Sequence, residues 1–129
     1  MEKLAGVHHV ALRCVDLERA EGFYRSVLGL EVLRRWPREG GGDRSVWLAL
    51  GAGFLALERA DGAGEPGGFH QAPAGWHAVA LTISLKARPL WEERLAARGV
   101  EVARRTRWSL FFSDPEGNRV ALTHWPEES

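Results

Sequence analysis

Residues His9–Cys14 (HVALRC) and the segment that follows them, Val15–Val32 (VDLERAEGFYRSVLGLEV), decide the fold. The first run is mostly apolar and predicts a strand. Asp16 can cap a helix, because its carboxylate accepts hydrogen bonds from backbone N–H groups of the first turn. Apolar residues then recur at three- and four-residue spacing as far as Gly29, a residue type that closes helices by adopting a left-handed conformation. The predicted order is therefore strand, helix, strand.

The second half of the chain repeats this order. Val79–Leu81 (VAL) repeats Val10–Leu12, and Gly99–Val102 (GVEV) repeats Gly29–Val32 (GLEV). Two repeats at nearly the same separation indicate a duplicated module. Two further strand-like runs follow each strand-helix-strand tract, so each module is predicted to be βαβββ.

Composition places the module boundaries. We expect module one over residues 1–58 and module two over 76–129, joined by a linker over 59–75 that is rich in Gly, Pro and Ala. Side chains alternate between the two faces of a strand, which predicts a core face and an open face in each module. Beneath the helices we expect Val10, Leu12, Leu55, Leu57, Val79, Leu81, Val120 and Leu122, and on the opposite face His9, Arg13, Ala78 and Ala121.

Charge and cysteine content limit the function classes. The formal net charge is zero, so no bulk attraction to nucleic acid or to an anionic membrane is expected. Cys14 is the only cysteine, which excludes an internal disulfide. The sequence shows neither a signal peptide nor a long apolar segment. We therefore expect a cytoplasmic protein.

Three features together carry a resemblance to a known family. They are His9 directly before Val-Ala-Leu, the helical run Phe23–Leu30 (FYRSVLGL), and the turn Asp114–Asn118 (DPEGN) before the last strand. With the duplicated module, they make the chain resemble the vicinal oxygen chelate superfamily, which holds glyoxalase I, fosfomycin-resistance transferases, extradiol dioxygenases and bleomycin-resistance proteins. The resemblance implies an α+β fold, with curled mixed sheets forming a barrel-like groove and the helices outside. It does not decide the function, because members share a scaffold while doing unrelated chemistry.

The resemblance also implies where a metal would sit. In the family's metalloenzymes a divalent cation lies in the groove and takes ligands from the first and fourth strands of each module. These positions fall on His9, Ala56, Ala78 and Ala121. Alanine offers no donor atom, so His9 would hold an ion alone or with Glu58, which shares the face of Ala56. Catalytic sites typically use three protein ligands, and we therefore expect no bound metal.

The other histidines do not supply the missing metal ligands. By alternation His77 and His124 point away from the groove, and His70 lies in the linker. A one-residue slip of the second module would bring His77 into the groove. The slip would also turn the apolar side chains of that strand out of the core, so we reject it.

Tryptophan supplies the stronger signal for a binding site. Trp76 and Trp125 are predicted on the groove face of module two, and Trp47 and Trp108 lie on strands that could border the groove. Because alanines floor the groove, these rings predict an open slot with aromatic walls. Arg13 shares the face of His9; in glyoxalase I the corresponding arginine helps to hold glutathione, and a surface ion pair is the alternative. The predicted ligand-binding residues are His9, Arg13, Trp47, Glu58, Trp76, Trp108 and Trp125.

Three function classes stay open. The first is a metal-free protein of the bleomycin-resistance kind that binds a small, flat, aromatic molecule, although the zero net charge counts against cationic bleomycin itself. The second is a metal-dependent lyase, isomerase or dioxygenase that uses His9 and Glu58. The third is a structural or regulatory module without a ligand. No catalytic residue is assigned. We expect a homodimer, because the open edge of a four-stranded half-barrel exposes backbone groups.

Overall fold

The structure is a computed structural model that describes residues 2–60 and 76–128. The chain divides into two compact units, Met1–Gly64 and Glu65–Ser129. Most of the predicted linker, including His70, lies outside the described residues. Among the described residues, neither helix has the length and hydropathy needed to cross a bilayer.

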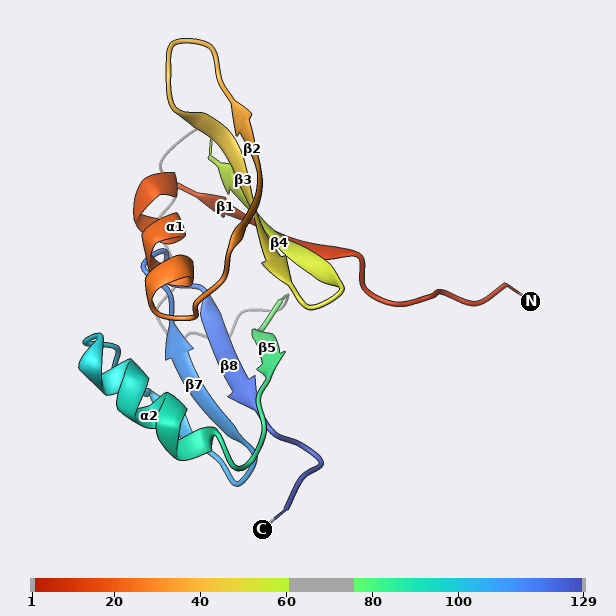
Figure 1. The fold of residues 1–129 in the computed structure, drawn as a ribbon, viewed down its shortest axis with the longest axis vertical. Coiled ribbons are helices and arrows are strands. Elements are labelled where there is room, and N and C mark those ends of the chain that lie inside the picture. The colour runs from red at the N-terminus through yellow and green to blue at the C-terminus, as the bar shows by residue number, and fades with distance from the viewer. Residues whose placement is uncertain (1, 61–75, 129) are drawn as a thin grey trace. The chain divides into compact units, whose positions relative to one another are not determined.

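Unit one is a βαβββ module (Figure 1). Its elements are β1 (His9–Cys14), α1 (Leu17–Ser26), β2 (Val32–Pro37), β3 (Asp43–Leu50) and β4 (Gly53–Arg59). The sheet has the order β1-β4-β3-β2, in which β1 pairs with β4 in parallel and the other pairs are antiparallel. The chain returns to pair its first strand with its last, so β1 and β2 form the two edges.

Unit two repeats this topology. Its elements are β5 (Val79–Thr82), α2 (Arg88–Ala97), β6 (Arg104–Arg105), β7 (Ser109–Ser113) and β8 (Arg119–Thr123), in the sheet order β5-β8-β7-β6. The predicted α+β class and the two βαβββ modules are confirmed. Each sheet is open and is not closed into a barrel. The N–H of Val100 bonds back to the carbonyl of Leu95 at 2.8 Å and closes the helix, so the second strand of this module begins only at Arg104.

The ends of α1 follow the sequence prediction. The Asp16 carboxylate accepts a hydrogen bond from the backbone N–H of Arg19 at 3.0 Å, which satisfies one of the unpaired donors of the first turn. Gly29 has a φ of 73°, the left-handed conformation that closes the chain after the helix. Between these ends the helix buries Leu17, Ala20 and Tyr24 against the sheet.

The core face of each sheet is largely as predicted. Leu55 and Leu57 of β4 and Val120 and Leu122 of β8 are no more than 3% exposed. By contrast, the predicted core residues on β1 and β5 are only half-buried: Val10, Leu12, Val79 and Leu81. The reason is the strand order, because β1 and β5 are edge strands whereas α1 packs on β4 and β3. Burial therefore follows position in the sheet as well as alternation.

An ion-pair network ties α1 to the sheet of unit one. Arg35 of β2 donates two hydrogen bonds to the Glu21 carboxylate, at 2.8 and 2.7 Å, and a third to Asp43 at 2.9 Å. Arg25 also contacts Glu21, at 3.1 Å. Hydrogen bonding from Arg35 lowers the pKa of Glu21 below its ordinary value and raises the pKa of Arg35.

We expect Arg35→Gln to weaken the protein in a pH-dependent way. A carboxylate with a lowered pKa in the folded state stabilises the fold above its unfolded pKa, and this contribution is lost as the pH falls through the folded pKa. At neutral pH the variant should lose up to about 1 kcal/mol of unfolding free energy, because the solvent-exposed guanidinium limits the gain. The difference from the parent should narrow below pH 4.5, the ordinary value for glutamate. Urea titrations of the variant and the parent at several pH values measure this difference in unfolding free energy.

The control for that prediction is Arg105→Gln in unit two. Arg105 pairs with Glu92 at 2.7 Å, but both side chains are more exposed than Glu21. Its loss should change the unfolding free energy less than the loss of Arg35 does. Equal losses for the two variants would contradict a special role for the Arg35 network.

Candidate functional site

The candidate site is the face of the unit-one sheet opposite α1, which we call the open face. The strand register places the same set of positions on it across all four strands. They are His9, Ala11 and Arg13 of β1, Phe54, Ala56 and Glu58 of β4, Ser45, Trp47 and Ala49 of β3, and Arg34 and Trp36 of β2. Four predicted site residues, His9, Arg13, Trp47 and Glu58, are therefore brought to one surface.

A continuous row of rings crosses the open face, and we call His9, Phe54, Trp47 and Trp36 the aromatic row. The His9 and Phe54 rings stack with centroids 4.7 Å apart and planes 4° apart. Phe54 stacks on Trp47 at 4.4 Å, and Trp47 meets Trp36 edge-to-face at 5.3 Å. The Arg34 guanidinium covers the outer side of Trp36 at 3.8 Å, a cation–π contact. The row thus takes one ring from each strand of the sheet.

Small and polar side chains lie beside the aromatic row. Ala56 pairs in register with Ala11 on one side and Trp47 on the other, and it is 1% exposed. Ser45 lies between Trp36 and Glu58 in register and is also 1% exposed. Arg13 lies opposite Glu58. The face therefore offers a polar end, formed around Ser45 and Glu58, next to a mostly aromatic surface.

Three polar atoms on this face are buried without a hydrogen-bond partner. They are Nε1 of Trp36, Nε1 of Trp47 and the hydroxyl oxygen of Ser45. A buried polar atom without a partner costs roughly 1–3 kcal/mol of stability. These three are the only such side-chain atoms within the described residues, and they gather at one place.

Two adjacent histidines stand at the other end of the row. The Nδ1 atoms of His8 and His9 are 2.9 Å apart, so one must donate and the other accept. Gly53 permits the close approach of β4 to the backbone of His8, because a Cβ at that position would lie 2.5 Å from the His8 carbonyl oxygen. Both histidines are exposed. The exposed ring of His9 therefore lies at the end of the aromatic row, within reach of solvent.

The three predicted tryptophans of unit two do not form a comparable group. Trp76 is 100% exposed and precedes β5, and Trp125 is 66% exposed and follows β8. The Trp108 ring lies 6.0 Å from that of His124. His124 is 3% exposed, and its Nε2 faces Nη1 of Arg88 on α2 at 3.0 Å, so it points to the helix side as predicted. Trp108 accordingly lies on that side too, away from the alanines of the sheet.

The prediction for His77 is wrong. Its ring lies 6.1 Å from that of Phe111, which pairs in register with Ala121 on the face opposite α2. His77 precedes the first residue of β5, so strand alternation does not extend to it. It therefore approaches the face of the unit-two sheet opposite α2 without any slip in the strand register.

The residues at the family's metal positions do not fit a divalent cation. Ala56 is 1% exposed and Ala121 is 2% exposed, so two of the four positions are buried methyl groups. Ala78 offers no donor either. Across residues 2–60 and 76–128, no group of three or more His, Cys, Asp or Glu side chains could hold a metal ion. His9 and Glu58 share the open face, but two ligands are fewer than catalytic sites usually provide.

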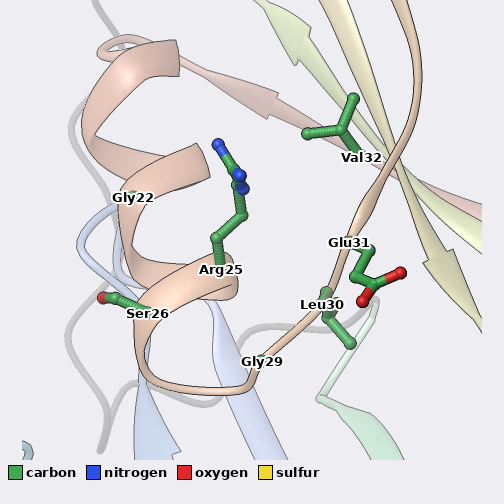
Figure 2. Close-up of a pocket in the computed structure, with 7 residues that line it drawn as sticks. All are labelled: Gly22, Arg25, Ser26, Gly29, Leu30, Glu31 and Val32. Atoms are coloured by element: carbon green, nitrogen blue, oxygen red, sulfur yellow. The ribbon is translucent and has the colours of Figure 1, made fainter.

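A separate depression lies on the helix side of unit one (Figure 2). It occupies about 660 Å³ and is lined by Gly22, Arg25, Ser26, Gly29, Leu30, Glu31 and Val32. None of these side chains is aromatic, and none was a predicted site residue. Its two charged lining residues, Arg25 and Glu31, have opposite signs. The aromatic row is therefore the better candidate for a binding site.

Sequence reasoning missed four residues of the site: Arg34, Trp36, Ser45 and Phe54. Two of them had a usable signal, since Phe54 has the parity of Ala56 and Ser45 has the parity of Trp47. For Trp36 and Arg34 the sequence carried no signal of which face they lie on. The register of β2 shifts between Val32 and Arg34, which changes the face on which later residues lie.

Comparisons with known proteins place the chain in one family of proteins. A model of the Glyoxalase/Bleomycin resistance protein/Dioxygenase superfamily matches residues 6–122. The lactoylglutathione lyase of Agrobacterium tumefaciens is 27% identical, with a TM-score of 0.72 over 98% of this chain and 100% of that one. The fosfomycin resistance protein FosX of Listeria monocytogenes, solved with Mn(II) and 1S,2S-dihydroxypropylphosphonic acid, is 17% identical, with a TM-score of 0.73 over 95% and 94%. FosX therefore supports the fold alone.

A curated relative matches a shorter stretch. The uncharacterized protein YwkD of Bacillus subtilis (strain 168) is 33% identical over 52 residues, which is 40% of this chain. The match spans 41% of that relative.

Proposed function

Because the chain belongs to the Glyoxalase/Bleomycin resistance protein/Dioxygenase superfamily, we propose that it is a metal-independent member that binds a small planar organic molecule. The molecule lies against the aromatic row of unit one. We further propose that the protein works in the cytoplasm as a homodimer, which fits a sequence whose only cysteine is buried.

The observation that carries this proposal is the aromatic row itself. A ring that stacks on aromatic side chains gains about 0.5–1.5 kcal/mol per pair beyond the area it buries. Ligand sites are mostly apolar, with a few placed polar groups that fix orientation. His9 and Arg13 supply such groups along β1, and Glu58 supplies one on β4.

The main alternative is a metal-dependent lyase, isomerase or dioxygenase. The likeness to the lactoylglutathione lyase favours it, as does the presence of His9 and Glu58 on one face. The alanines at positions 56, 78 and 121 count against it, because they offer no donor where metalloenzymes of the family carry ligands. A structural module without a ligand is the third candidate, and the aromatic row counts against it.

A binding titration tests the proposal. We expect at least one of three planar bicyclic probes, naphthalene, coumarin or indole, to bind saturably, with the same affinity in EDTA as without it. Ligand-observed NMR measures the affinity. If EDTA abolishes binding, the metal-dependent alternative replaces the proposal. If none of the three probes binds, the aromatic row is not a site for planar ligands.

A further inference from the structure

The open face carries a set of hydrogen-bonding atoms that no contact within the described residues uses. Trp36 Nε1, Trp47 Nε1 and the Ser45 hydroxyl are each buried without a partner. Ser45 is the register partner of Trp36 on the neighbouring strand. Trp47 follows two residues along β3 from Ser45 and shares its face. The three atoms therefore belong to adjacent side chains on one surface.

The chemistry of these atoms limits what could satisfy them. An indole N–H only donates, and a serine hydroxyl can donate as well. Two donors and a hydroxyl therefore call for an acceptor atom. No carboxylate of the described residues fills this role, since neither indole has a partner among them and Glu58 lies across from Ser45 rather than beside the indoles.

Charge selects further among ligands. Arg34 covers Trp36 at 3.8 Å, and Arg13 lies on the same face, whereas Glu58 is the acidic residue opposite Arg13. A cationic group near Trp36 would be repelled by the Arg34 guanidinium. A neutral or partly negative oxygen would not be repelled.

Resting on the function proposed above, we infer that the ligand is a planar ring bearing an acceptor oxygen, such as a ring carbonyl. The oxygen accepts hydrogen bonds from Trp36 Nε1, Trp47 Nε1 and the Ser45 hydroxyl, while the ring stacks on the aromatic row. The missing partners of the three atoms are then supplied by the ligand.

Trp36 is the side chain whose ring turns so that the ligand oxygen can reach the buried N–H groups. The two indole N–H groups are covered in the unbound protein, so a ring must turn before a ligand reaches them. Trp36 lies on the edge strand β2, next to a register shift at Pro37, and its outer side is held by the exposed Arg34. Trp47 is instead held between Phe54 and Trp36 on an inner strand.

Three probes of similar size separate the contributions. Coumarin carries only acceptor oxygens, naphthalene has no polar atom, and indole carries only a donor. We expect coumarin to bind about tenfold more tightly than naphthalene or indole, which corresponds to about 1.4 kcal/mol. In ¹H–¹⁵N spectra, coumarin should move the indole N–H signals of Trp36 and Trp47 downfield, as a new hydrogen bond does. Naphthalene should leave these two signals without a downfield shift.

Conservative variants assign the effect to named atoms. Trp36→Phe keeps a ring and removes the N–H, and Ser45→Ala removes the hydroxyl. Each should weaken coumarin binding about threefold to tenfold and weaken naphthalene binding less, because naphthalene only stacks. Trp108→Phe is the matched control, because its ring lies against His124 in unit two, and it should alter neither probe.

The outcomes distinguish this inference from the proposed function. If naphthalene binds as tightly as coumarin and neither indole signal shifts, the row binds by stacking alone and the inference is wrong. If Trp36→Phe and Ser45→Ala weaken both probes equally, their effect is structural, and the inference is again wrong. If none of the three probes binds, the proposed function fails, and the inference fails with it.

Discussion

Trp47→Ala is expected to lower the affinity for coumarin and for naphthalene at least about tenfold. Trp47 is an inner member of the aromatic row, and its ring touches both neighbours, Phe54 at 4.4 Å and Trp36 at 5.3 Å. Its loss removes a stacking surface and also leaves Trp36 without support on its inner side. The affinity for both probes should fall, because this substitution removes the ring as well as the N–H. Ligand-observed NMR titration measures the change.

Trp108→Ala serves as the control for the size of the change. It removes a ring of the same type, half-buried like Trp47, from a position against His124 in unit two. Affinity for both probes should stay within about twofold of the parent, while circular dichroism reports that each variant is folded. Equal losses for the two variants would show that the ligand does not use the aromatic row.

Local chemistry explains why the module topology could be predicted. Asp16 and Gly29 mark the ends of α1 through backbone hydrogen bonds and a positive φ, and neither effect depends on distant parts of the chain. The turn before β8 is equally local. Asp114 accepts bonds from the N–H groups of Glu116 and Asn118, both at 2.8 Å.

The site was harder to predict because it depends on strand neighbours. Alternation placed His9, Arg13 and Glu58 on one face correctly, whereas Trp47 was predicted only to lie on a strand bordering the groove. It could not place Trp36, whose face is set by the register shift after Val32. His77 was misjudged for a different reason, because alternation was extended to a residue that lies before the first residue of β5.

Ala56→Glu is expected to destabilise the protein by about 3 kcal/mol or more. The position is 1% exposed and lies between Ala11 and Trp47 in register, so a carboxylate there would be buried without a cationic partner on either side. Ala11→Glu is the matched control. It places the same side chain on the same face, at the register partner of Ala56, but on an exposed edge position. Its cost should stay within about 0.5 kcal/mol.

Metal ions turn this pair of variants into a test of the binding proposal. Position 56 is one of the four positions where the family resemblance places a metal ligand, so Ala56→Glu returns one donor to a face that already carries His9 and Glu58. If these groups cannot complete a site, Zn²⁺ or Mn²⁺ should leave the melting temperature of the variant unchanged, because a ligand stabilises a protein only by binding its folded state. A large rise with either metal, absent from Ala11→Glu, would mean that the open face retains the geometry of a metal centre. The stacking surface would then be secondary to a metal-dependent chemistry.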